Sequence, residues 1–220
     1  MSTTPPVPKL PVDAVLGDLR RVLRDGVSAV LVAPPGAGKT TRVPPALLDE
    51  PWLEGRRIIL LEPRRLAARA AAERMASERG ERVGETVGLR ARLDTRVGPK
   101  TRIEVVTEGV FTRMIVDDPA LDGIGAVIFD EFHERSLDAD AGLAFAIYAR
   151  AGLRDDLRLL VMSATLDGAR VASLLGDAPV IETEGRTFPI ETRYLGRPAD
   201  RRIEDAMVEA ITGAIRSETG

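Results

Sequence analysis

Residues 28–41 read SAVLVAPPGAGKTT, a short apolar run followed by a loop rich in glycine and proline and then by a lysine and two threonines. The unbroken apolar run predicts a strand covered on both faces, as in a parallel sheet. A helical pattern resumes after the loop, over residues 40–48. A strand, a glycine-rich loop and a helix in this order predict an anion-binding nest of backbone N–H groups at a helix N-terminus.

The residue types of this loop point to a nucleotide. Gly36 and Gly38 permit backbone angles that other residues rarely adopt. Gly38-Lys39-Thr40 ends a Walker A pattern whose first glycine is replaced by Ala33, and in that pattern the lysine reaches the β- and γ-phosphates and the hydroxyl holds Mg²⁺. An incidental lysine in a glycine-rich turn is disfavoured, because strand, loop and helix all occur where the motif requires them. We therefore predict an ATP site at Pro35, Gly36, Ala37, Gly38, Lys39, Thr40 and Thr41.

The same alternation of apolar runs and helical segments continues along the chain. Further apolar runs, each predicting a buried strand, cover residues 57–62, 102–107, 126–131 and 157–165. Segments with helical patterns lie at residues 66–79, 109–116 and 138–149. Strands that alternate with helices are the signature of right-handed βαβ units. We therefore predict an α/β fold with a doubly wound, mostly parallel sheet and helices on both faces.

The two ends of the chain differ from this pattern. Apolar residues recur at helical spacing from Val12 to Leu23, and Gly26 then ends the predicted helix. Residues 1–11 are proline-rich and are expected to be a flexible leader rather than a signal peptide. Residues 179–195 predict an extended tail and residues 200–216 an amphipathic helix. One domain, residues 12–197, is expected between leader and helix.

Composition narrows the class of protein. The 220 residues suffice for one full α/β core. The chain has no cysteine, which fits a reducing cytoplasm, and no run of 18 apolar residues that would predict a membrane span. The formal net charge of −3 argues against a uniformly basic nucleic-acid binder but permits a local basic groove.

A dense cluster of charge follows another predicted strand, where residues 126–136 read AVIFDEFHERS. Ligands of doubly wound sheets bind beyond the carboxyl ends of the strands, where the glycine-rich loop also lies. Asp130 is therefore predicted to hold Mg²⁺, and Glu131 to orient and deprotonate the attacking water. A solvated turn is the alternative, which the glycine-rich loop upstream makes less favourable. His133 is the only histidine and lacks partner ligands for a metal.

Together these motifs resemble those of the DEAH/RHA-type superfamily 2 helicases, in their first RecA-like lobe. GAGKTT, DEFH and SAT (163–165) occur in the family's order, EPRRLAARAAAERMA (62–76) is similar to motif Ia, and TEGVFTRM (107–114) is similar to motif Ib. The resemblance covers about residues 10–195. Phe132, where the family usually has alanine, resembles one bacterial branch.

The resemblance implies further roles. His133, Ser163 and Thr165 would couple hydrolysis to lobe movement, and Arg74 would stack on the nucleotide base. The expected partner is single-stranded nucleic acid, RNA rather than DNA, with backbone contacts from Arg64, Arg65, Thr107 and Gly109. Taken by themselves, Arg64 and Arg65 could instead be a solvated helix start, Ser163 and Thr165 a capped turn, and Arg74 a solvated side chain.

The family also has a second RecA-like lobe that carries arginine fingers. Residues 198–220 resemble the entry to that lobe, so the chain is expected to be a fragment that lacks it and hydrolyses ATP slowly. Two other functions remain open on the residues alone. One is a P-loop ATPase that drives a different mechanical task, and the other is a nucleotide-binding scaffold without catalysis.

Overall fold

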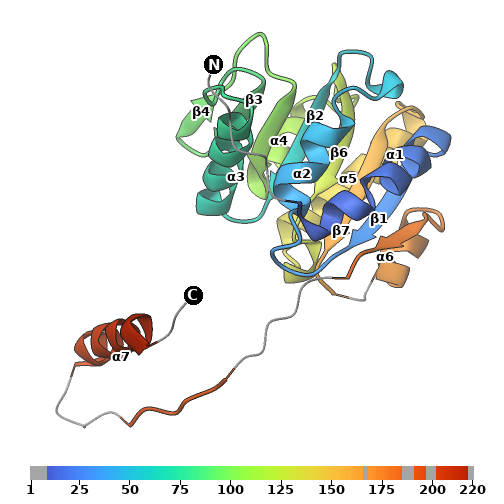
Figure 1. The fold of residues 1–220 in the computed structure, drawn as a ribbon. Coiled ribbons are helices and arrows are strands. Elements are labelled where there is room, and N and C mark those ends of the chain that lie inside the picture. Colours follow the sequence, from blue (N-terminus) through green and yellow to red (C-terminus); the bar gives the residue numbers. More distant parts are fainter. Residues whose placement is uncertain (1–8, 166–167, 185–190, 197–201, 218–220) are drawn as a thin grey trace, which may run out of the picture. The chain divides into compact units, whose positions relative to one another are not determined.

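A single mixed sheet runs through the larger part of the chain (Figure 1). The computed structural model describes residues 9–165, 168–184, 191–196 and 202–217. Within these residues eight strands pair in the order β4-β3-β5-β2-β6-β7-β1-β8, and all neighbours are parallel except β3 and β4. The strands are β1 (Ser28–Val32), β2 (Arg57–Glu62), β3 (Val87–Ala91), β4 (Asp94–Arg96), β5 (Ile103–Thr107), β6 (Ile124–Phe129), β7 (Arg158–Ser163) and β8 (Val180–Glu182).

Helices cover both faces of the sheet, which confirms the predicted doubly wound α/β fold. The α-helices of the described residues are α1 (Leu16–Asp25), α2 (Lys39–Leu47), α3 (Arg65–Glu78), α4 (Glu108–Asp117), α5 (Leu137–Gly152), α6 (Gly168–Leu174) and α7 (Ile203–Ser217). Short 3₁₀ helices occur at Pro11–Ala14, Pro51–Leu53 and Phe132–Glu134.

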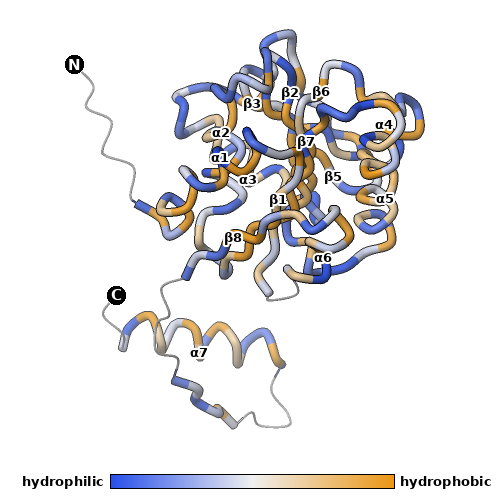
Figure 2. Tube along the Cα trace, turned by 90° about the vertical axis from the view of Figure 1, so that its right-hand side faces the viewer, coloured by the Kyte–Doolittle hydropathy of each residue, from blue (hydrophilic) through white to orange (hydrophobic). Residues whose placement is uncertain are grey.

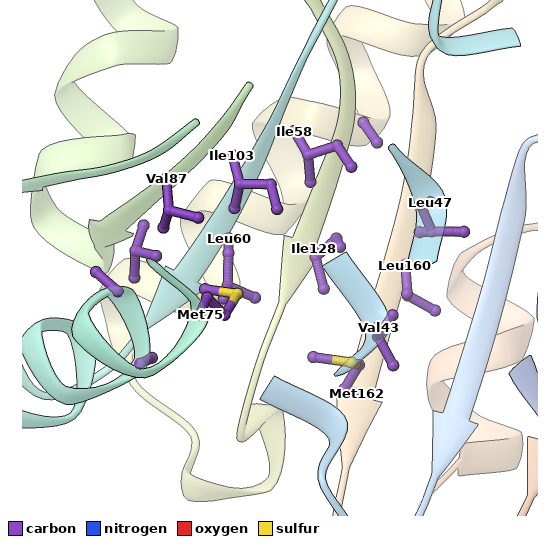
Figure 3. Packing of buried hydrophobic residues seen from close by; sticks show 14 of the residues in the cluster. Val43, Leu47, Ile58, Leu60, Met75, Val87, Ile103, Ile128, Leu160 and Met162 are labelled. Carbon is purple, nitrogen blue, oxygen red and sulfur yellow. The ribbon is translucent and has the colours of Figure 1, made fainter. Parts of the chain in front are cut away.

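Alternate residues of the central strands β1, β2, β5, β6 and β7 enter two separate cores, since successive side chains of a strand point to opposite faces. Ile58 and Leu60 face helices α1, α2 and α3 in the core shown in Figure 3. Ile59 and Leu61 face α4, α5 and α6 instead. Figure 2 shows the hydrophobic colouring along the central strands, as expected for strands buried on both sides.

Four elements were missed by the sequence analysis. Strand β3 is buried, but Gly88 and Arg90 interrupt its apolar run, and β4 is only three residues long. Gly88 is required by packing, because a Cβ there would lie 2.8 Å from Thr101 Cγ2. Within the predicted extended tail, Val180–Glu182 pairs with β1 as strand β8. Helix α6 is short, and no helix or strand was predicted for its residues.

The described residues from 191 onward form a separate unit. The predicted terminal helix is present as α7, and none of its residues is buried. Its apolar side chains Ile203, Met207, Ile211 and Ile215 recur every four residues, which gives the helix one apolar stripe. The expected boundary at residue 197 stays a prediction. No helix in the described ranges is long and apolar enough to cross a membrane.

The two-sided burial of β2 gives a stability test. Leu60 is 0% exposed and Leu66, six residues later on α3, is 83% exposed. Leu60→Ala is expected to lower the free energy of unfolding by about 2–5 kcal/mol, because it leaves a cavity in a packed core. The control Leu66→Ala should change it by less than about 0.5 kcal/mol. Urea denaturation measures both, and equal losses would contradict the assignment of Leu60 to the core.

Candidate nucleotide-binding site

The glycine-rich loop between β1 and α2 has the backbone geometry that the sequence predicts. Gly36 and Gly38 both have positive φ angles, 76° and 92°, which L-residues rarely adopt. A Cβ on Gly38 would also lie 2.6 Å from Leu10 Cδ1. Leu10 and Pro11, assigned to the leader by sequence, thus lie beside the loop, and the Val12 N–H donates to the Ala37 carbonyl at 3.1 Å.

Lys39 begins α2 and is buried. Its Nζ donates to the Ala33 carbonyl at 2.7 Å and lies 3.9 Å from Glu131 Oε1. A buried ammonium is costly unless it is paired and hydrogen-bonded. Lys39 meets both conditions, and it places one positive charge between the loop and the end of β6.

The hydroxyl of Thr40 donates a hydrogen bond to Asp130 Oδ2, which joins the start of α2 to the end of β6. The other carboxylate oxygen of Asp130 accepts from the Glu131 N–H at 2.8 Å. A hydroxyl and a buried carboxylate are hard oxygen donors of the kind that Mg²⁺ prefers. The two residues predicted to hold the metal are therefore adjacent.

The donor set fits Mg²⁺ bound together with phosphates rather than in a cage made of protein alone. Across the described ranges, no group of three or more His, Cys, Asp or Glu side chains is arranged to hold a metal ion. Proteins usually hold Mg²⁺ through one or two carboxylates plus substrate phosphates and water. Asp130 with Thr40, next to an anion-binding loop, matches that arrangement.

Glu62 is a site residue that the sequence analysis missed. It ends β2, is buried, and lies beside Asp130, which directly follows the neighbouring strand β6. Burial and then the charge of Asp130 raise the pKa of Glu62 to about 9. Burial also raises the pKa of Asp130, although its hydrogen bond to Thr40 opposes the shift. The signal was present, because RIILLE ends in an acid at a strand end just as AVIFD does.

His133 connects the end of β6 to the end of β7. Its Nδ1 accepts a hydrogen bond from the Ala164 N–H at 3.3 Å and lies 3.3 Å from Glu131 Oε2. A neutral Nδ1 accepts from Ala164, whereas a protonated Nδ1 would donate to Glu131. Ser163, buried at the end of β7, accepts from the Thr165 N–H at 3.3 Å. The structure thus places the three predicted coupling residues around the acidic strand end.

Two of the predicted nucleic-acid-binding segments follow neighbouring strands. Glu62 and Thr107 are register partners at the ends of β2 and β5, so Arg64 and the Thr107–Gly109 segment emerge side by side. Arg64 is exposed and forms an ion pair with Glu134 at 2.9 Å. Arg65 is also exposed but lines a different hollow, beside β3 and β4.

Arg74 lines the same hollow as Thr40, Thr41 and Glu131. It projects from α3 into a hollow of about 480 Å³ and donates to Glu78 Oε1 at 2.6 Å. The hollow is also lined by Thr40, Thr41, Glu62, Arg64, Glu131 and Glu134. The lining of this one hollow thus includes Thr40 and Thr41 of the predicted phosphate site, together with Glu131 and Arg74.

A P-loop beside an acidic strand end, on a doubly wound sheet, is typical of P-loop nucleotide-binding domains. Among these, the chain belongs to the DEAD/DEAH box helicase family. The family model matches residues 19–174. Among individual proteins, the chain is 54% identical to the Escherichia coli ATP-dependent RNA helicase HrpB over 96% of its own length. It is 32% identical to the Haemophilus influenzae ATP-dependent RNA helicase HrpA homolog over 94% of its length.

Solved structures agree with the sequence comparison. The chain matches the crystal structure of the E. coli DEAH/RHA helicase HrpB with a TM-score of 0.85, over 96% of this chain and 27% of that chain. A crystal structure described as the E. coli DExH-box NTPase HrpB matches with a TM-score of 0.79 and 52% identity, over 99% of this chain and 27% of that one. These matches confirm the predicted resemblance to the DEAH/RHA-type helicases and to the bacterial branch that Phe132 indicates. The chain spans about a quarter of the length of HrpB, 26% of it by sequence, and 16% of the HrpA homolog.

The buried carboxyl of Glu62 predicts a dependence of stability on pH. A carboxyl whose folded-state pKa is raised to about 9 stabilises the fold fully at pH values below 4.5, and this contribution is lost as the pH rises towards 9. We expect the free energy of unfolding in metal-free buffer to fall between pH 5 and pH 9, and Glu62→Gln to reduce that fall. Urea denaturation at both pH values measures it. The control Glu73→Gln removes an exposed carboxyl, and an equal effect of the two variants would contradict the prediction.

Proposed function

We propose that this chain is the ATP·Mg²⁺-binding lobe of a nucleic-acid-dependent ATPase of the helicase type. The proposal rests chiefly on the hydrogen bond between Thr40 and Asp130, because it joins the phosphate loop to the acidic strand end. In this proposal hydrolysis drives movement along single-stranded RNA or DNA in the cytoplasm. The family membership and the likeness to HrpB support this class of activity.

The loop residues bind the nucleotide. Backbone N–H groups of residues 36–41, at the N-terminus of α2, donate hydrogen bonds to the phosphates, and Lys39 neutralises charge on the β- and γ-phosphates. Thr40 and Asp130 hold Mg²⁺, which when bound neutralises charge that develops on the phosphate oxygens. Arg74, on the wall of the same hollow, stacks on the base.

Glu131 acts on the attacking water. Its carboxylate lies 3.9 Å from Lys39 Nζ and 3.3 Å from His133 Nδ1, so it is held at the edge of the phosphate site by two partners. Phosphoryl transfer depends mainly on positioning and charge neutralisation, which is the work assigned to these side chains. His133, together with Ser163 and Thr165, communicates the state of the nucleotide.

The partners lie beyond this lobe. The E. coli relative HrpB is called an RNA helicase, and it is about four times as long as the segment that this chain matches. We therefore infer two partners for this lobe, a second RecA-like lobe and single-stranded RNA. The second lobe would supply arginine fingers, which are worth roughly 10³–10⁵ in rate. Arg64, Arg65, Thr107 and Gly109 hold the nucleic-acid backbone.

The division of labour between Lys39 and Glu131 can be tested directly. Lys39→Ala is expected to abolish ATP binding, because the lysine neutralises phosphate charge before and during reaction. Glu131→Gln should bind ATP normally and lower turnover by about 10²–10⁴-fold, because the general base is lost. Calorimetric titration and a phosphate-release assay, carried out on the protein with both lobes, separate the two effects. Glu54→Gln, an exposed site remote from the loop, is the control, and parental turnover by Glu131→Gln would refute the role of Glu131.

The nucleic-acid contacts predict a particular dependence on salt. One lobe offers few phosphate contacts, so binding of single-stranded RNA should weaken with a logarithmic salt slope of about 1–3 in magnitude. Arg64→Gln is expected to reduce that slope by about 1, and Arg21→Gln, exposed on α1, should leave it unchanged. Fluorescence anisotropy at several salt concentrations provides the measurement. Binding that is indifferent to salt would exclude a groove that tracks the backbone.

A further inference from the structure

The turn at residues 131–136 joins the predicted water-orienting acid to the start of α5 and has an unusual backbone. Glu131 and Arg135 have φ angles of 47° and 48°, in the left-handed region that non-glycine residues seldom occupy. Between them lies one 3₁₀ turn, with the Glu134 N–H donating to the Glu131 carbonyl at 2.9 Å. Such a conformation persists only where its surroundings hold it. The contacts of the 131–136 turn therefore determine where Glu131 lies.

The strongest of these contacts joins the turn to the segment proposed to bind nucleic acid. Ser136 caps α5 by accepting from the Ala139 N–H at 2.9 Å, and its hydroxyl donates to Glu108 Oε2 at 2.6 Å. Glu108 stands between Thr107 and Gly109 in the first turn of α4. A hydrogen bond to a charged acceptor is stronger than one between neutral groups.

Neighbouring contacts keep the two helix starts together. The Thr112 hydroxyl lies within 3.4 Å of the Asp138 carbonyl, and a Cβ on Gly109 would lie 3.4 Å from Asp138 Oδ2. The ion pair between Arg64 and Glu134 attaches the same turn to the other proposed nucleic-acid-binding segment. A phosphate of a bound nucleic-acid strand would compete with Glu134 for Arg64. Binding of the strand would therefore affect both contacts of the turn, the one from Ser136 to Glu108 and the one from Glu134 to Arg64.

We propose that the Glu108–Ser136 hydrogen bond transmits nucleic-acid binding to Glu131, so that Glu108 and Ser136 are positioning residues for nucleic-acid-stimulated ATP hydrolysis. The proposal rests on the proposed function. When a nucleic-acid strand binds at Thr107 and Gly109, it fixes the position of Glu108 between them. Glu108 then fixes the position of Ser136 through their hydrogen bond, and the 131–136 turn transmits this constraint to Glu131.

A matched pair of variants at position 108 tests the hydrogen bond alone. Glu108→Gln and Glu108→Met are both uncharged and similar in length, but only glutamine retains an acceptor for Ser136. In the protein with both lobes, kcat and KM for ATP are measured without nucleic acid and with saturating poly(U). Glu108→Met should lose about five- to tenfold of the stimulation by poly(U), while Glu108→Gln keeps most of it. The rate without nucleic acid, KM for ATP and affinity for poly(U) should match within the pair.

A second pair at position 136 separates the link from the helix cap. Ser136→Thr keeps a hydroxyl that both caps α5 and donates to Glu108. Ser136→Asp keeps a cap acceptor for the Ala139 N–H but replaces the donor hydroxyl with a carboxyl group, whose negative charge repels Glu108. We expect Ser136→Asp to resemble Glu108→Met and Ser136→Thr to resemble the parent, with thermal melts showing that all four variants fold.

The outcomes distinguish this inference from the proposed function. A parent protein that poly(U) and poly(dT) both fail to stimulate would overturn the proposed function and the inference with it. A stimulated parent whose Glu108→Met and Ser136→Asp variants are equally stimulated would overturn the inference alone. It would also be overturned if Glu108→Gln lost as much as Glu108→Met, or if the loss lay in poly(U) affinity instead of kcat.

Discussion

The hydrogen bond from Thr40 to Asp130 connects residues 90 positions apart, and the site is organised around it. It forms because β1, β7 and β6 are parallel and adjacent, so their carboxyl ends meet at one edge of the sheet. The loop after β1 and the acid after β6 then lie on either side of the end of β7. Ser163, His133 and Glu131 fall into reach of one another for the same reason. A change in the register of any of these strands would separate the residues predicted to bind phosphate from those predicted to bind the metal.

Local patterns predicted those parts of the molecule that depend on local properties. Four strands were predictable because their apolar runs are unbroken, and β5 was predictable although Glu104 interrupts its run. The P-loop was predictable because its glycines, lysine and threonine stand at fixed spacing. Strand β3 was missed because Gly88 and Arg90 break its run, although packing against Thr101 explains the glycine. Glu62 was missed because its importance depends on which strand lies next to β2. The Glu108–Ser136 hydrogen bond depends on how α4 packs against α5, a contact over 28 residues that no short pattern predicts.

The electrostatics of the site depend on the burial of several acids beside few cations. Asp130 and Glu62 are buried next to each other, and burial raises the pKa of both. Lys39 is the buried cation at this edge of the sheet and lies close to Glu131. Phosphates bound at the loop would add further negative charge. In the proposed function a divalent cation is therefore bound jointly by the phosphates and by the protein. In that function Thr40 and Asp130 would suffice as the donors that the protein supplies to the cation, because the phosphates would supply others.

The approach of Leu10 to Gly38 has a consequence for how this lobe is handled in the laboratory. Leu10 packs against the glycine that opens α2, the Val12 N–H binds the Ala37 carbonyl, and the Thr183 hydroxyl donates to the Pro11 carbonyl at 3.2 Å. Residues 10–12 thus pack against the glycine-rich loop and also contact the end of the edge strand β8. An expression boundary or affinity tag placed at Leu10 would alter the nucleotide site itself, although the family motifs would all be intact.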